Sequence, residues 1–365
     1  MRLTRDTSPK MKDALPNPNV NEVPDVDVSE GDVLTKLGTV ADRQDMLRMG
    51  RKQELRRQFQ FWSITGWAVI MACSWEFAVI NIVVTLKNGG KAGSIWELIF
   101  TVFGMLFVTL IRAGFAEMAS MAPTVRICGQ LGNINAQQVT ALMNLAHPIF
   151  VPALWQTSLL PLSILLLVIL TNTIIFRKLP VIELVLTILH VLGFIAFVSV
   201  LWATADRGSA HDVFTSFDGT GWPSASLAFL TGVTGPVNCF VNADSSVHLG
   251  EEIRDAAYVL PRSMVVTAIS NYILSLCVVV TLVFCLGDID AVLGSSIGQP
   301  YLAVILNATH SRAVTMVFGV VVLVLVVACS VNGATAASRL LWSFARDGGP
   351  PFSAWLAKVR PGWDM

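Results

Sequence analysis

Glu76 is an ionisable side chain placed deep inside an apolar stretch. It lies in the sequence MACSWEFAVIN, near the middle of the run 61–86, with Trp75 beside it. An ionisable group at the centre of a membrane span is costly and is therefore a functional candidate. A carboxylate there can bind the ammonium group of a solute, or take up a proton if burial favours the neutral acid. The alternative is that Glu76 extends to the outer interface and has no such role.

A second candidate lies in the run 224–248, which is interrupted partway along. Its central part reads LTGVTGPVNCFVNAD, with Gly235 and Pro236 at the interruption. Proline removes a backbone donor and clashes with the preceding turn, and glycine tolerates the unwound backbone that results. The pattern predicts a discontinuous helix, whose free carbonyls and half-helix ends can bind a solute near the bilayer midplane. A simple proline kink is the alternative.

Other polar and aromatic residues complete the candidate set. Phe240 and Asp244 follow the interruption, and Glu251 lies farther along, where we interpret it as a gate or loop residue. His190 is the other ionisable residue well inside an apolar run, with Glu183 seven residues earlier on about the same helical face. His190 is a candidate for coupling or gating, and a packing histidine is the alternative.

Enzymes are the weakest class for this sequence. It contains no GxSxG elbow, no HExxH pair, no phosphate-binding Walker loop and no paired-cysteine metal spacing. We therefore expect no catalytic residues, no metal ion and no cofactor.

The composition indicates a membrane protein with a polar tail. Of the 365 residues, 54% are hydrophobic and 14% are charged, against about 25% charged in a typical soluble domain. The net charge is zero, so nothing suggests a nucleic-acid partner. Residues 1–60 hold a disproportionate share of the charges. The lipid bilayer is the expected partner of the remainder.

Seven apolar runs are each long enough to be a transmembrane helix. They lie near residues 61–86, 95–118, 156–176, 181–203, 224–248, 263–286 and 313–338. Lipid offers backbone groups no hydrogen-bond partner, so these runs must be helical. We expect an all-α integral membrane protein with a cytoplasmic tail over 1–58, a membrane domain over 59–345 and a cytoplasmic end over 346–365.

Basic residues near the span ends predict the orientation. The cluster before the first span places the N-terminus in the cytoplasm, and Arg126, two spans later, is also inside. Arg177 and Arg346 are predicted to be cytoplasmic too. Only one run separates Arg126 from Arg177, however, and one crossing cannot begin and end on the same side. A crossing is therefore missing near 127–155, a stretch that is too polar to span alone.

The loop between the last two runs is predicted to be external. It carries an N-glycosylation sequon at Asn307, in the sequence Asn-Ala-Thr. Such short sequons also arise by chance, so both alternatives stay open: Asn307 is glycosylated, or it is not.

Many motifs in order resemble one known family. The sequence resembles the fungal amino acid and choline permeases, of the amino acid, polyamine and organocation superfamily, from about residue 47 to the end with one gap. The motifs are LRMGRKQELRRQF, AEMASMAPT, RKLPVIE, RGSAHDVFTSF, GWPS, HLGEEIRDAAYVLPRSM, FCLGDIDAVL, GQPYLAVILNAT and ATAASRLLWSFARDGGPPFSAWLAKVRPGWD.

The resemblance implies a leucine-transporter-like inverted repeat of five plus five helices, with two more. On that template the chain holds about seven transmembrane helices and lacks the third helix and helices 9 to 12. The resemblance matches Trp75 and Glu76 to the substrate site of the first helix, and it matches Gly235, Pro236, Phe240 and Asp244 to the break of the sixth. Phe77 departs from the small residue usual there, which puts unwinding of the first helix in doubt.

These observations favour a plasma-membrane secondary transporter. We expect it to move an amino acid, γ-aminobutyrate, choline or a related amine by alternating access, with the proton as coupling ion. One alternative is an incomplete, transport-inactive product of such a permease gene. A seven-span receptor is disfavoured, because seven spans place the termini on opposite sides while the basic clusters place both inside.

Overall fold

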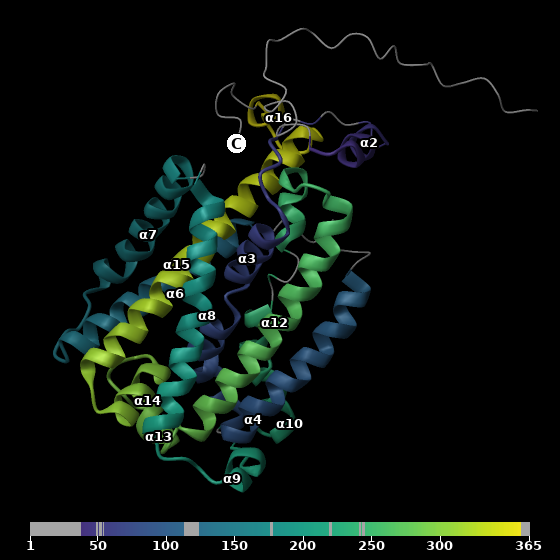
Figure 1. Ribbon diagram of the computed structural model, residues 1–365. Coiled ribbons are helices and arrows are strands. Elements are labelled where there is room, and N and C mark those ends of the chain that lie inside the picture. The colour runs from purple at the N-terminus through teal and green to yellow at the C-terminus, as the bar shows by residue number, and fades with distance from the viewer. Residues whose placement is uncertain are drawn as a thin grey trace, which may run out of the picture.

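The computed structural model is a bundle of helices, shown in Figure 1. It describes residues 38–358 except 49, 51–52, 54, 113–123, 176–177, 219–220, 241 and 243–244. The helices are α2 (Val40–Arg48), α3 (Phe61–Ala72), α4 (Ser74–Arg112), α6 (Thr124–Ala146), α7 (Leu154–Ile175), α8 (Leu179–Thr204), α9 (Ala210–Thr215), α10 (Ala225–Gly232), α11 (Thr234–Phe240), η2 (Ser245–Glu252), α12 (Ala256–Phe284), α13 (Ile289–Leu293), α14 (Pro300–Thr309), α15 (Arg312–Arg346) and α16 (Ser353–Leu356).

Five segments of the described chain are long and apolar enough to cross a membrane. They are Phe61–Gly104, Leu154–Ile174, Val181–Thr204, Ala256–Phe284 and Arg312–Arg346. This confirms the expected all-α membrane architecture. The number differs from the seven apolar runs for two reasons. The first run and the beginning of the second lie in one segment, and the run 224–248 is divided into short helices.

The bundle has two distinct ends. Figure 1 shows α2 and α16 at one end, which we call the tail end, and α9, α13 and α14 at the other, which we call the loop end. The segments before the first span and after the last therefore lie at the same end. Ion pairs gather at the tail end: Arg57 with Asp42 at 3.0 Å, Arg339 with Glu252 at 2.5 Å and Arg346 with Glu251 at 2.5 Å.

The first run is broken just before Trp75 and Glu76. Cys73 adopts a left-handed conformation with φ of 46° and ends α3, and α4 begins at the next residue. The break lies ahead of Phe77, so the bulk of that residue does not prevent it. Helix α4 then turns at Gly90, whose φ of 65° and ψ of −155° are accessible to glycine. Its second arm runs back along the first.

The fifth run is divided into α10, α11 and η2. The division between α10 and α11 falls at Val233, three residues before Pro236. Proline cannot donate to the carbonyl four residues earlier, which here belongs to Gly232. The regular helix is therefore interrupted after Gly232, and a second interruption follows Phe240. At Val233 the backbone stays right-handed helical, with φ of −53° and ψ of −24°, and Val237 N–H donates to the Val233 carbonyl at 3.1 Å. The interruption at Gly235 and Pro236 is therefore the simple proline kink of the alternative, and the helix proper ends at Phe240, ahead of η2.

Helix α6 lies in the stretch where the sequence analysis expects a missing crossing. It has 23 residues, long enough for a hydrocarbon core of about 30 Å. It runs antiparallel to α15, because Asn135 hydrogen-bonds Ser330 at 2.7 Å while Leu142 packs against the earlier Gly319. Its low hydropathy leaves it outside the five apolar segments, but Asn135 and Gln138 hydrogen-bond to Ser330 and Tyr301 of neighbouring helices. The absence of the family's third helix stays a prediction.

The largest apolar core lies around the first arm of α4. Trp75, Phe197, Tyr301 and Leu325 are fully buried in it, and they come from α4, α8, α14 and α15. Helix α7 lies at the margin of the bundle with most of its apolar side chains exposed. An exposed apolar face suits contact with lipid or with another transmembrane helix.

Candidate functional site

Trp75, Glu76 and His190 form a buried cluster between α4 and α8. All three side chains have zero exposure. The Nδ1 atom of His190 lies 2.7 Å from Oε1 of Glu76 and 3.1 Å from Nε1 of Trp75. The indole also packs against Phe197, with ring centroids 5.9 Å apart. The sequence analysis proposed Glu76 and His190 separately, and the structure brings them together.

This cluster has two arrangements that differ in the position of one proton. If Glu76 is ionised, Nδ1–H of His190 donates to the carboxylate. If Glu76 is neutral and Nδ1 carries no hydrogen, the single lone pair of Nδ1 is shared between the O–H of Glu76 and the indole N–H of Trp75. In the described part of the chain, Oε2 of Glu76 and Nε2 of His190 have no hydrogen-bond partner.

The two interrupted helices meet at the carbonyl of Met71. The side-chain amide of Asn242 donates to this oxygen at 3.0 Å, and the thiol of Cys329 donates to it at 3.2 Å. A carbonyl in the last turn of a helix has lost its intrahelical donor and needs another partner. The break at Cys73 thus faces the break that follows Phe240.

Gly235 and Pro236 line a small cavity between α4, α11 and α12. Asn81, Thr85 and Ser94 contribute polar groups to its wall, and the Ser94 hydroxyl donates to Thr85 at 2.8 Å. The amide nitrogen of Asn81 is buried and has no partner among the described residues. The rest of the lining is apolar, with Ala78, Ile82, Leu98 and Val279, so the cavity is a small and mainly apolar one beside the divided helix.

The structure separates the residues that the resemblance assigned to one substrate site. Glu76 does not line the cavity, because it lies about 140° around α4 from Asn81 and faces α8 instead. Phe240 packs against Tyr272 of α12, with ring centroids 4.6 Å apart. Asp244 lies outside the described residues. Glu251 is at the tail end, bound to Arg346.

Two further buried carboxylates were not proposed as site residues. Glu183 of α8 accepts a hydrogen bond from Asn332 of α15 at 3.1 Å. Glu97 of α4 is fully buried, and neither of its oxygens has a partner in the described structure. The sequence signal for Glu97 was an acidic residue near the start of the run 95–118, where it is easily taken for an interfacial group.

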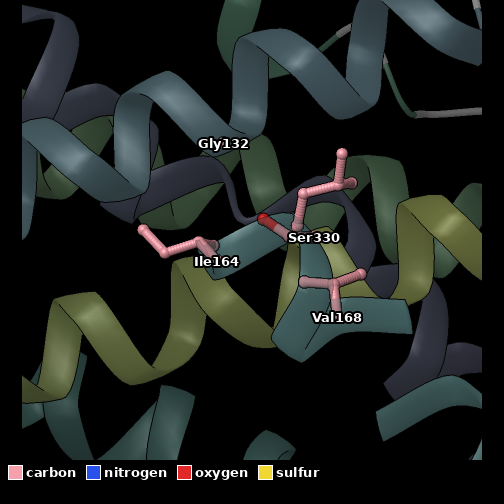
Figure 2. A pocket seen from close by; sticks show the side chains of 5 residues that line it. Gly132, Ile164, Val168 and Ser330 are labelled. Carbon is pink, nitrogen blue, oxygen red and sulfur yellow. The ribbon is translucent and has the colours of Figure 1, made fainter. Parts of the chain in front are cut away.

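A second cavity lies between α6, α7 and α15. Figure 2 shows Ile164 and Val168 of α7 beside Gly132 of α6 and Ser330 of α15. The Ser330 hydroxyl is engaged with Asn135 and with a carbonyl of its own helix. The cavity is apolar and its one hydroxyl group is already hydrogen-bonded, so we do not expect it to bind a polar solute.

Glu252 is the buried acid of the tail end. Burial raises the pKa of its carboxyl group, and the nearby Arg339 opposes this rise. Its main-chain carbonyl accepts from Phe59, so the segment before the first span is held to the end of η2. The candidate gate residue Glu251 lies beside it, within a set of ion pairs that closes the tail end.

Asn307 is exposed in α14, close to the loop end. The Thr309 hydroxyl of its sequon is bonded to the carbonyl of Ile305. Use of the sequon stays a prediction. No cluster of three metal-ligating side chains occurs within the residues that the structure describes.

The apolar helices, their interruptions and the buried ionisable cluster define a multi-pass membrane protein. Residues 128–363 match the family of amino acid permeases, and the chain belongs to that family. This confirms the resemblance. The match covers more than half of the chain, including α7, α8, the divided helix and α15.

Individual relatives are distant. The chain is 25% identical to the choline transporter of Saccharomyces cerevisiae over 347 residues, covering 84% of this chain and 60% of the relative. It is 27% identical to an uncharacterized amino-acid permease of Schizosaccharomyces pombe, covering 87% of this chain and 65% of the relative. It is 34% identical to the transmembrane transporter swnT of Metarhizium robertsii, over 44% of this chain and 32% of the relative. The chain thus spans less than two thirds of the length of these three relatives.

Proposed function

We propose that this chain acts in secondary active transport of small nitrogenous solutes by alternating access, with the proton as coupling ion. The observation that carries the proposal is the contact between two interrupted helices, in which Asn242 binds the Met71 carbonyl at 3.0 Å. Paired breaks of this kind provide backbone groups for a polar solute within a bilayer. The names of the relatives support amino acids and choline as solute classes.

The solute would bind where the breaks meet. An ammonium group that entered there would take the place of the Asn242 amide at the Met71 carbonyl. Gly235 and Pro236 interrupt the neighbouring helix, and the mainly apolar cavity beside them offers the solute the polar groups of Asn81, Thr85 and Ser94. Phe240 follows at the end of α11, where its ring can contact the apolar part of the solute or a quaternary amine. Asp244 stays a proposed ligand on the strength of the resemblance.

The Glu76 and His190 pair is our candidate for proton coupling. It lies directly after the break at Cys73, so a change in its charge acts on the residues that shape the break. A buried carboxylate and imidazole that share one proton form a neutral acid and base or an ion pair. Binding a second proton leaves a net positive charge, which is costly in an apolar core and favours a rearrangement. The indole of Trp75 contacts Nδ1 of His190, so the same change of charge acts on Trp75 as well.

We place the tail end in the cytoplasm and the protein in the plasma membrane. A cluster of six basic residues comes directly before the first span, as the positive-inside rule requires of a cytoplasmic end: Arg43, Arg48, Arg51, Lys52, Arg56 and Arg57. In this proposal, residues 1–58 and 346–365 are cytoplasmic, 59–345 form the membrane domain, and Glu251 belongs to the inner gate.

The alternative is that the chain is an incomplete, transport-inactive product of a permease gene. It spans 60% of the choline transporter that it resembles, and α7 leaves an apolar face uncovered. An alternating-access site needs walls from both halves of the bundle. Walls that are absent would leave the site open to lipid.

Uptake into lipid vesicles distinguishes the two proposals. The chain as given and a version completed with the third helix and helices 9 to 12 of a full-length relative would be tested with labelled choline and amino acids. We expect concentrative uptake by the completed version under an imposed proton gradient. Equal uptake by the 365-residue chain would reject the incompleteness alternative. No uptake by either version would reject transport of these solutes.

A further inference from the structure

Glu97 is a buried acid that the proposed site does not use. It lies seven residues after the turn at Gly90, on the second arm of α4. Its side chain has zero exposure, and both carboxyl oxygens lack hydrogen-bond partners among the described residues. Glutamate is rarely buried without a partner. The arrangement therefore indicates that the carboxyl group of Glu97 binds and releases a proton or a cation.

Three glycines make the space that the carboxyl group occupies. A Cβ atom built on Gly89 would lie 2.6 Å from Oε1 of Glu97, and one built on Gly93 would lie 3.4 Å from it. A Cβ atom on Gly232, at the end of α10, would collide with the whole carboxyl group. Glu97 is thus packed against the point where the helix is interrupted. The carbonyl of Gly232 cannot receive a helical hydrogen bond from Pro236.

Little nearby charge is free to compensate an ionised Glu97. Helix α10 has no ionisable residue, α11 has only Cys239, and Arg262 of α12 lies over Tyr258 near the start of that helix. The ionisable side chains toward the loop end, from α4, α9, α13 and the connection after α9, are Lys87, Lys91, His211, Asp212, Asp218 and Asp290. Lys91 is held by Asp212 at 2.7 Å. An ionised, unpaired carboxylate in this position would cost several kcal/mol.

We propose that Glu97 is a proton-binding site whose occupancy is coupled to the packing of α10. The carboxyl group is neutral while Gly232 covers it. It releases its proton to water only when α10 moves away and opens the site toward the loop end. This assignment rests on the proposed function, alternating access around the interrupted helix, and adds that α10 moves during it.

Infrared spectroscopy tests the protonation state independently of transport. The purified full chain in lipid vesicles would be measured at about pH 7, where an ordinary glutamate is ionised. We expect a carbonyl band of a neutral carboxylic acid that Glu97→Gln removes and Glu97→Asp retains at a shifted frequency. The matched control Glu183→Gln should leave that band in place. Identical spectra for the parent chain and Glu97→Gln would overturn the proposal.

Substitution of Gly232 tests the coupling to α10. In Gly232→Ala the added methyl group meets the carboxyl group, so we expect the Glu97 band to disappear at a lower pH than in the parent chain. Gly104→Ala is the matched control, because no atom lies within 4 Å of its added Cβ. An unchanged titration in Gly232→Ala would reject the coupling. A Glu97 band without solute uptake would support the proton site and count against the transport proposal. Solute uptake without the Glu97 band would support the transport proposal and reject the proton site.

Discussion

The side-chain amide of Asn242 donates to the main-chain carbonyl of Met71 at 3.0 Å and so joins the two interrupted helices of the bundle. Met71 lies in the last turn of α3, where the break at Cys73 leaves carbonyls without intrahelical donors. The divided helix therefore caps the broken one. The conformation described here is one in which the breaks are closed on each other.

Removal of the Asn242 amide should loosen this contact. In Asn242→Ala the Met71 carbonyl keeps only the weak thiol donor of Cys329. We expect a loss of about 1 to 3 kcal/mol in the free energy of unfolding, the cost of a poorly satisfied buried acceptor. Denaturant unfolding in detergent micelles measures it, with Asn307→Ala, at an exposed position of α14, as the control. A loss in unfolding free energy no larger than that of the control variant would show that this hydrogen bond does not hold the two breaks together.

Replacing Glu76 by Gln separates its two proposed roles in the completed transporter. If the carboxylate binds the solute directly, affinity for cationic solutes falls by about 1 to 3 kcal/mol, as for a charge-assisted hydrogen bond. If Glu76 with His190 carries the proton, binding survives and accumulation against a gradient is lost. The burial of Glu76 against His190 favours the second outcome. Equilibrium binding and proton-driven uptake are the two measurements.

Normal binding and normal concentrative uptake in Glu76→Gln would remove the residue from the mechanism. His190→Gln is the companion variant, because it retains a polar side chain but cannot take a positive charge. Under the coupling role it should have the same phenotype as Glu76→Gln.

Asp42 ties the tail to α12 in a way that depends on pH. Burial by itself would raise the pKa of Asp42, but hydrogen bonds from the main-chain N–H groups of Asp255 and Thr39, together with the charge of Arg57, lower it below 3.8. Because the pKa is depressed in the folded state, the stabilisation is fully present above pH 3.8 and is lost as the pH falls through the folded value. We expect the tail to detach only in strong acid.

Limited proteolysis of the segment before the first span measures this detachment. Asp42→Asn should make the segment cleavable near neutral pH and weaken its docking by about 1 kcal/mol, as for the loss of a helix cap. Asp45→Asn is the matched control, since Asp45 is 40% exposed and its ion pair in the described structure is a local one with Arg48. Equal protection of Asp42→Asn and the parent chain would contradict the role of Asp42.

Gly90 should not tolerate a side chain. Its φ of 65° and ψ of −155° lie in a region reserved largely for glycine, and an added Cβ would lie 2.9 Å from the main-chain nitrogen of Asp218. We expect Gly90→Ala to lower the free energy of unfolding by about 1 to 3 kcal/mol. Gly104→Ala, in the same helix with open space around it, should be close to neutral. Equal unfolding free energies for the two variants would contradict this account.

The sequence by itself determined the class of the fold and the identity of several key residues. Apolar runs in a chain with 14% charge require helices in lipid, and Pro236 with its neighbouring glycines predicted an interruption of the helix, as a break or as a kink. Glu76 and His190 were recognisable because an ionisable side chain within an apolar run is costly wherever it lies. These are local properties of the chain, so they can be read without knowing which helices touch.

Only the tertiary structure decided which groups face each other. It paired Glu76 with His190, placed Gly235 and Pro236 on a different side of α4, and left Glu97 against Gly232 without a partner. It also sheltered the polar helix α6 against α15. Hydropathy measures each side chain against lipid or water. The partner of a buried polar group lies on a helix far away in sequence, and the packing of the bundle alone brings the two within hydrogen-bonding distance.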